Sequence, residues 1–321
     1  MHILILGAGG MIGRKLAARI VRDAAIGTRP VTRLTLADIA APPPPAFTGQ
    51  ADAIAINLAD PGAADRLVTD RPDIIFHLAA VVSGEAEADF DKGYAVNLDA
   101  SRALFEGIRT LPDYHPRLIF ASSIAVFGPP FPSVIPDDFH LTPRTSYGTQ
   151  KAATELLISD YTRREIFDGI ALRLPTICIR PGAPNRAASG FFSSILREPL
   201  AGLPAILPVP DTVRHWFASP RAAVGFFLHA AALDSARIGP TRALNMPGLS
   251  ATVAEEIEAL RRVAGQNAVD LIRRVPDETV ARIVGGWAER VDATRATALG
   301  FTAETDFDQI IQAYLDDDAP A

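Results

Sequence analysis

Short apolar runs alternate with stretches of helical periodicity through the first half of the chain. Apolar residues recur at helical spacing from Ile12 to Ile20, from Phe90 to Ile108, and from Tyr147 to Phe167. Strands that alternate with helices indicate a parallel sheet covered on both faces. We therefore expect an α/β fold with a doubly wound parallel sheet. The runs that predict its strands are His2–Leu6, Arg33–Asp38, Ala53–Asn57, Asp73–Leu78, Arg117–Ser122 and Gly169–Leu174.

The pattern changes after Arg180, where proline and glycine interrupt the chain as far as Pro210. Further helices are expected near 191–196, after the capping-box pair Thr252 and Glu255, and across 307–314. We expect residues 1–177 to form one domain and residues 178–321 to form mainly a smaller C-terminal lobe. Part of 216–246 is expected to return to the first domain.

A glycine turn follows the first expected strand and opens the first helix, at Gly7, Gly10 and Gly13. Without a Cβ, these residues permit a tight turn, the approach of a pyrophosphate, and close packing of helix on strand. The N–H groups at the helix start, including those of Met11 and Ile12, favour phosphate oxygens. The strand–turn–helix context predicts a dinucleotide site on a Rossmann-type sheet. The alternative is a glycine turn without a ligand.

Asp38 ends the second expected strand. A carboxylate there can accept hydrogen bonds from the adenosine ribose hydroxyls, and it would repel the 2′-phosphate of NADP. Arg33 begins the same strand and is expected to lie too far away to bind that phosphate. We therefore expect NAD as cofactor, the alternative being that Asp38 is only a strand-end turn residue.

Tyr147 and Lys151 are four residues apart in a helical segment, which places both on one helix face. A neutral tyrosine is a poor base near pH 7, and a neighbouring ammonium favours its phenolate form. Ser123 follows the fifth expected strand, where its hydroxyl can bond a reacting oxygen. A tyrosine and a lysine four residues apart occur by chance on many helices. Combined with the glycine turn and Ser123, the pair predicts proton and hydride transfer at an alcohol carbon.

The 321 residues carry a formal net charge of −6. This charge does not attract nucleic acid or anionic membranes over long range, so neither is expected as a partner. The one cysteine, Cys178, lies in an apolar run and is expected to be a buried, inert thiol. No basic leader and no apolar run of roughly 20 residues is present, which favours the cytoplasm. No residue spacing indicates a metal site.

These motifs resemble those of the extended short-chain dehydrogenases/reductases, which include nucleotide-sugar epimerases and dehydratases. GAGGMIG resembles the family's glycine turn, SSIAVFG its serine segment with Ser123, and YGTQK its YxxxK motif. HLAA and Asn97 resemble further family landmarks, although Asn57 replaces the usual aspartate beside the adenine. Besides the glycine-turn residues and Asp38, the resemblance implies cofactor contacts from Asn57, Leu58, Leu78, Ala79, Ala80, Asn97, Tyr147, Lys151, Pro175, Thr176 and Ile177.

Several details resemble one branch of the family, which uses NAD to oxidise the C2 hydroxyl of a short sugar acid to a 2-oxo acid. These are ADPGAADRL, VVSGEAEADFDKGYAVN and LPTICIRPGAPN. A sugar-acid substrate needs a cation for its carboxylate, and arginine can grip a carboxylate with two parallel hydrogen bonds. Arg214 is the favoured anchor, with Arg180 and Arg186 as alternatives; each can equally be a surface arginine. The other expected substrate contacts are Ser83, Ser123, Tyr147 and Thr176.

Two other functions remain open. One is a nucleotide-sugar epimerase or dehydratase that holds NAD tightly and regenerates it in each cycle, so that NADH does not accumulate. The other is a non-catalytic NAD-sensing regulator, which has no need for Ser123, Tyr147 and Lys151 together. The resemblance also implies a homodimer formed through helices Phe90–Ile108 and Tyr147–Phe167.

Overall fold

The computed structural model describes residues 1–182 and 188–319, which belong to two compact units. Each unit is assembled from three separate segments of the chain. The first unit comprises Met1–Val126, Pro143–Arg173 and Val224–Leu244. The second comprises Phe127–Thr142, Leu174–Ala223 and Asn245–Ala321. Within the described ranges, no helix is long and apolar enough to cross a membrane.

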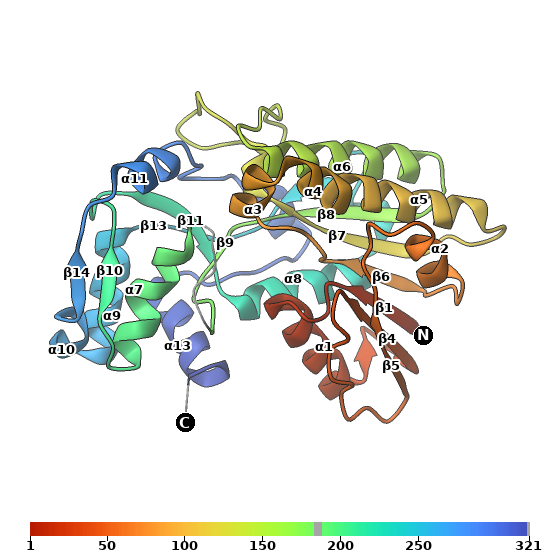
Figure 1. The fold of residues 1–321 in the computed structure, drawn as a ribbon, viewed down its shortest axis with the longest axis horizontal. Helices are drawn as coiled ribbons and strands as arrows, with labels where there is room; N and C mark the ends of the chain where they lie inside the picture. Colours follow the sequence, from red (N-terminus) through yellow and green to blue (C-terminus); the bar gives the residue numbers. More distant parts are fainter. Residues whose placement is uncertain (183–187, 320–321) are drawn as a thin grey trace. The chain divides into compact units, whose positions relative to one another are not determined.

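The first unit is built on a seven-stranded sheet in the order β12-β8-β7-β6-β1-β4-β5 (Figure 1). β1 pairs in parallel with β4 and β6, β4 with β5, and β6 with β7. The strand order reverses between β1 and β6, which confirms the predicted Rossmann-type, doubly wound fold. The strands are β1 (His2–Leu6), β4 (Arg33–Asp38), β5 (Gln50–Ala55), β6 (Ile74–His77), β7 (Arg117–Ser123), β8 (Asp168–Leu174) and β12 (Ala243–Asn245); a short hairpin adds β2 (Ala25–Ile26) and β3 (Arg29–Pro30).

Helices cover both faces of this sheet, with α4, α5 and α6 on one face in Figure 1 and α1 with α8 on the other. Successive side chains of a strand point to opposite faces of its sheet. On β1, Leu4 and Leu6 point to the face covered by α5, where they share a core cluster with Leu104 and Ile108. The helices are α1 (Met11–Asp23), α2 (Ala63–Val68), α3 (Ser83–Ala88), α4 (Phe90–Tyr94), a π-helical turn (Ala95–Asp99), α5 (Ala100–Thr110), α6 (Ser146–Arg163) and α8 (Pro220–Ala232), with 3-10 turns at Ile124–Val126 and Ser235–Arg237.

The second unit has its own core, in which Phe192 of α7, Leu260 of α9 and Ile310 of α13 are fully buried. The predicted capping box at Thr252 and Glu255 is present and begins α9. The helices are α7 (Gly190–Leu200), α9 (Val253–Ala264), α10 (Gln266–Val269), α11 (Glu278–Val284), α12 (Thr294–Ala298) and α13 (Phe307–Asp317). The strands are β9 (Thr176–Ile177), β11 (Arg214–Ala218) and β13 (Leu249–Thr252) in one sheet, and β10 (Ala205–Leu207) with β14 (Ile272–Arg274) in another.

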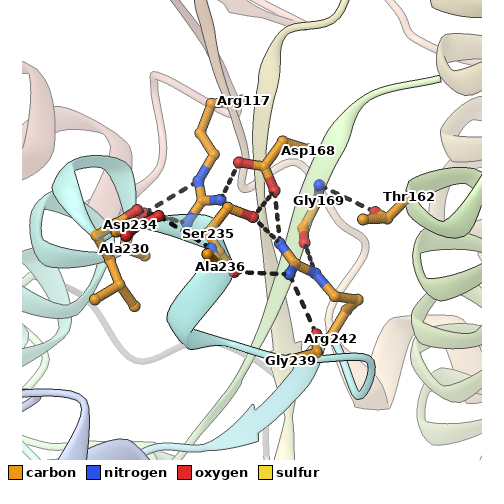
Figure 2. A network of polar contacts seen from close by, with 11 residues as sticks. Arg117, Thr162, Asp168, Gly169, Ala230, Asp234, Ser235, Ala236, Gly239 and Arg242 are labelled. Atoms are coloured by element: carbon orange, nitrogen blue, oxygen red, sulfur yellow. Dashed lines mark hydrogen bonds and ion pairs between the residues drawn. The ribbon is translucent and has the colours of Figure 1, made fainter. Parts of the chain in front are cut away.

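Asp168 ties the returning segment 224–244 into the first unit (Figure 2). Its carboxylate, at the start of β8, pairs with two buried guanidinium groups, those of Arg117 at the start of β7 and Arg242 just before β12. Arg117 also donates to the carbonyl of Ala230 in the last turn of α8, over 2.7 Å, where a cation suits the helix dipole. Arg242 donates to the Gly169 carbonyl, also over 2.7 Å. Two cations from different segments therefore share one acidic group, which joins β7, β8 and the returning segment.

Replacing Asp168 with alanine is expected to lower the free energy of unfolding by about 1.5–3 kcal/mol, because it leaves two buried cations without their acid. Chemical denaturation checks this value. Asp160→Ala is the matched control, since Asp160 pairs with Arg163 at the surface and should cost less than about 1 kcal/mol. Equal losses for the two variants would contradict the assignment of Asp168 as the central acid.

Candidate active site

The glycine turn between β1 and α1 is shaped by close backbone contacts. Gly7 has φ +83°, and a Cβ there would lie 2.7 Å from the backbone nitrogen of Ala79. A Cβ at Gly13 would collide with the Gly7 carbonyl oxygen. At Gly10, by contrast, a Cβ would approach only that same oxygen, at 3.3 Å, and otherwise enter open space. The fold itself therefore requires Gly7 and Gly13, whereas Gly10 leaves the start of α1 open to a ligand.

This open helix start fits a pyrophosphate. Helix α1 begins at Met11, and the first N–H groups of a helix have no acceptor inside it. Phosphate oxygens can accept from those groups at the positive end of the helix dipole. The residues present therefore fit the phosphates of a dinucleotide.

Asp38, at the end of β4, is held against the glycine turn. Its Oδ2 accepts from the Gly9 nitrogen over 2.8 Å, and its Oδ1 accepts from the Ile39 nitrogen over 2.7 Å. Arg33 lies at the opposite end of β4 and pairs with Asp70 over 2.6 Å. The charge at the carboxyl end of this strand is therefore negative, which favours NAD over NADP.

Two asparagines that the sequence assigns to the cofactor stabilise loops of the first unit. The Asn57 amide donates to Asp60 Oδ1 over 2.8 Å and so closes the turn after β5. Asn97 lies in the π-helical turn, where its Oδ1 accepts from the Val81 nitrogen over 2.8 Å and its Nδ2 donates to the Val81 carbonyl over 3.1 Å. Asn97 thereby fixes the loop that follows β6. That loop carries the candidates Leu78, Ala79 and Ala80, and Ser83 begins α3 just after it. These four residues and Leu58 are partly exposed, and Ala79 and Leu58 pack against the core.

The segments that carry Ser123 and Tyr147 lie side by side. Ser123 ends β7, and its Oγ accepts from the Ala125 nitrogen over 3.2 Å. Tyr147 lies in the first turn of α6, followed by Gly148, where a Cβ would collide with the Ala125 carbonyl oxygen. Glycine at 148 therefore lets the start of α6 approach the chain just beyond Ser123. The sequence alone does not reveal this role of Gly148, because the role depends on a contact between separate segments.

Lys151 is almost fully buried, one helical turn after Tyr147, with 1% of its surface exposed. Its Nζ lies 5.5 Å from the centre of the Tyr147 ring and 4.5 Å from the centre of the Phe120 ring. Burial lowers the pKa of Lys151 to about 7, and the negative charge of Glu155 acts in the opposite direction. The first unit thus brings Ser123, Tyr147 and Lys151 into one region, as their motifs predict.

The second unit holds the remaining candidates. The Thr176 hydroxyl lies 2.6 Å from Nε2 of the buried His215 ring, which stacks on Phe192. Arg214 donates to the Ser250 carbonyl over 3.1 Å and pairs with Glu255 over 3.2 Å. The other candidates here are Arg180, which donates to Ile177 and Ser189, the buried Pro175 and Ile177, and Arg186, which lies outside the described residues.

The fold and the first unit's residues define a dinucleotide-binding Rossmann protein with a Ser–Tyr–Lys set. Residues 3–218 match the model of the NAD dependent epimerase/dehydratase family, and the chain belongs to this family. It is 47% identical to D-erythronate dehydrogenase of Cupriavidus necator, over 99% of this chain and 98% of that protein. It is 41% identical to D-erythronate dehydrogenase of Haemophilus influenzae, over 99% of this chain and 100% of that protein.

A solved structure described as the nucleoside-diphosphate-sugar epimerase from Agrobacterium tumefaciens is also similar. It shares 61% sequence identity with a TM-score of 0.97, over 99% of this chain and 94% of that chain. The family and the open glycine turn agree on the cofactor, which is NAD. The names of the relatives differ on the reaction, because a dehydrogenase releases NADH and an epimerase regenerates NAD.

Gly10→Ala is expected to weaken NAD binding by about tenfold or more, because the new methyl group occupies the space through which the pyrophosphate approaches. The melting temperature without NAD should stay unchanged, since no backbone atom other than the Gly7 oxygen is near. Calorimetric titration with NAD measures the affinity. Gly225→Ala, on α8 with no atom within 4 Å of its Cβ, is the matched control. Normal NAD affinity in Gly10→Ala would place the phosphates elsewhere.

Proposed function

We propose that this chain is an NAD-dependent dehydrogenase that oxidises the C2 hydroxyl of a short sugar acid, D-erythronate, to 2-dehydro-D-erythronate. The similarity to two D-erythronate dehydrogenases along nearly the whole chain carries the choice of substrate. The buried Lys151 beside Tyr147 supports the chemistry, because a cation at this place favours a phenolate that can accept a proton.

In the proposed reaction, Tyr147 accepts the proton of the C2 hydroxyl while the C2–H bond breaks and the carbonyl forms. Ser123 donates a hydrogen bond to the reacting oxygen. Lys151 stabilises the phenolate of Tyr147 and binds the ribose beside the nicotinamide. NAD, when bound, supplies the acceptor for the hydride that leaves C2.

The proposed NAD contacts lie mainly on the first unit, and further substrate contacts lie on the second. We assign residues 1–177 to NAD binding and residues 178–321 mainly to the substrate. The residues proposed to contact NAD are Gly7, Gly10, Met11, Ile12, Gly13, Asp38, Asn57, Leu58, Leu78, Ala79, Ala80, Asn97, Tyr147, Lys151, Pro175, Thr176 and Ile177. Those proposed for the substrate are Ser83, Ser123, Tyr147, Thr176, Arg180 and Arg214.

A sugar-nucleotide epimerase is the second candidate, and the 61% identical structure described as such favours it. A screen distinguishes the two functions. The purified chain is incubated with NAD and, in turn, with four- and five-carbon aldonates, uronates and nucleotide sugars, while NADH absorbance is followed. We expect NADH to accumulate with D-erythronate in proportion to the acid consumed. Epimerised nucleotide sugar without net NADH would instead establish the second candidate.

Tyr147→Phe is expected to lower kcat by about 10²–10⁴-fold, because it removes the proton acceptor and keeps the ring. NAD affinity should survive, since the glycine turn and Asp38 are untouched. Steady-state kinetics and NAD titration measure the two effects. Tyr161→Phe, at a ring on the same helix that bonds Glu106, serves as the control and should keep its turnover. A Tyr147→Phe variant that retains most of its kcat would show that another group is the base.

Arg214→Ala is expected to raise KM for D-erythronate by about ten- to a hundredfold, because a charge-assisted hydrogen bond to the substrate carboxylate is lost. Arg214→Lys should recover only part of the loss, since an ammonium cannot form the paired contact. Arg262→Ala, which breaks a surface pair with Asp308, is the control. If Arg214→Ala has a normal KM, Arg214 serves only Ser250 and Glu255, and the anchor is Arg180 or Arg186.

We also propose a homodimer formed through α4–α5 and α6. Phe90 on α4 and Leu156 on α6 are 58% and 66% exposed, and large apolar side chains exposed on neighbouring helices suit a second copy of the chain. Sedimentation of the wild type and of a Leu156→Glu variant tests this assembly. A monomeric wild type at micromolar concentration would contradict it.

A further inference from the structure

We propose that the aromatic ring of Phe120 is a positioning group for the proposed reaction and holds the Lys151 ammonium in its charged form beside Tyr147. The inference rests on the proposed function for its catalytic meaning. Its physical content, a cation held by a ring, can be tested without any substrate.

Phe120 and Lys151 meet inside the first unit, away from water. Phe120 lies on β7 and is fully buried, and Lys151 on α6 is 1% exposed. The Lys151 Nζ lies 4.5 Å from the Phe120 ring centre, within the range in which an aromatic face attracts a cation. The His77 ring meets Phe120 edge to face, 5.3 Å between centres, and His77 itself lies 2.8 Å from the Ser101 hydroxyl. The ring of Phe120 is thus held by His77 on β6, which Ser101 on α5 holds in turn.

None of the titratable groups around Lys151 in the described residues is an acid that forms an ion pair with it. On its own helix are Tyr147 and Glu155, on β6 is His77, and on β8 is Arg173. Among the described residues, Glu155 forms its ion pair with Arg173, over 2.9 Å, and accepts from Ser122 over 2.5 Å; no carboxylate lies within 4.0 Å of the Lys151 nitrogen. Burial and the charge of Lys151 lower the pKa of His77 to about 3, so the histidine is neutral.

The chemistry of an aromatic ring explains why it suits this position better than a carboxylate. A carboxylate in contact with Lys151 would stabilise the ammonium, but its negative charge would also disfavour a phenolate at Tyr147. A ring attracts the ammonium through its quadrupole and carries no net charge. The positive field of Lys151 at Tyr147 is therefore not cancelled by the group that holds it.

The lysines of the chain are Lys15, Lys92 and Lys151, so NMR of protein labelled with ¹³C-lysine gives few signals to resolve. Absence of one signal in Lys151→Met assigns Lys151. In the wild type, Lys151 should titrate near pH 7, consistent with its burial. Phe120→Leu removes the quadrupole, and the midpoint should fall by about one pH unit.

A graded series separates the electrostatic role from packing. Site-specific replacement of Phe120 by mono-, di- and trifluorophenylalanine keeps the ring and weakens its quadrupole step by step, so the Lys151 midpoint should fall step by step. Phe105→Leu is the matched control, since Phe105 is equally buried in the same core but contacts Tyr161 and Phe167. Its Lys151 midpoint should equal that of the wild type. The same midpoint throughout the fluorinated series would overturn the proposal.

Kinetics connect the titration to catalysis. In the fluorinated series, the alkaline limb of the pH profile of kcat should move to lower pH, because Lys151 loses its charge at a lower pH, while KM for D-erythronate stays within about twofold. If the Lys151 titration midpoints fall and the alkaline limb of the kcat profile does not move, Phe120 has no positioning role in the reaction. If no sugar acid is oxidised at all, the proposed function fails, and the NMR titration still decides whether the ring holds the charge.

Discussion

Helix α6 buries polar side chains against the central sheet, and the region around Ser123, Tyr147 and Lys151 depends on how these side chains are paired. Gln150, Lys151, Thr154 and Glu155 are all at most 2% exposed. A buried polar group without a partner costs free energy, and a buried charge costs more. The partners that satisfy this helix therefore determine the positions of the neighbouring loops and strands.

These partners reach the loop after β6 and the end of β7, both of which carry candidate residues. The Gln150 amide oxygen accepts from Asn97 over 2.7 Å, and Asn97 in turn holds both backbone groups of Val81 in the loop after β6. Glu155 accepts from Ser122, the neighbour of Ser123 on β7, and from Arg173 on β8. Two sets of hydrogen bonds from α6 thus orient the loop after β6 and the end of β7 relative to the helix that carries Tyr147.

The sequence pattern predicts the frame of this arrangement well. The bounds of β1 and β4 agree with the predicted runs, because strands buried on both faces are continuous apolar segments. The short β12 was not expected, and β5 begins three residues before Ala53, since its exposed positions are polar or small. The predicted helix from Phe90 to Ile108 is interrupted by a π-helical turn, which periodicity does not resolve.

Partners across the fold could not be predicted, because periodicity indicates burial and not the neighbour. Phe120 has the pattern of any core residue on a strand, and only the position of α6 reveals that its ring faces an ammonium. The glycine turn and the YxxxK motif are different, since each carries its chemistry within a few consecutive residues. Local motifs are therefore enough to single out Ser123, Tyr147 and Lys151 as candidates, whereas the groups that contact them are found only in the structure.

The Glu155–Arg173 pair shows what the polar face of α6 contributes. Both side chains are almost fully buried, and replacing such a pair with apolar residues is often neutral or stabilising in other proteins, so stability alone does not explain it. Glu155 pairs with Arg173 rather than with Lys151, and its negative charge still acts to raise the pKa of Lys151. An unpaired carboxylate at this position would oppose a phenolate at Tyr147. An apolar residue there would remove the charge that counters the lowering of the Lys151 pKa by burial. We infer that Glu155, paired with Arg173, and the Phe120 ring together favour the charged form of Lys151 without cancelling its field at Tyr147.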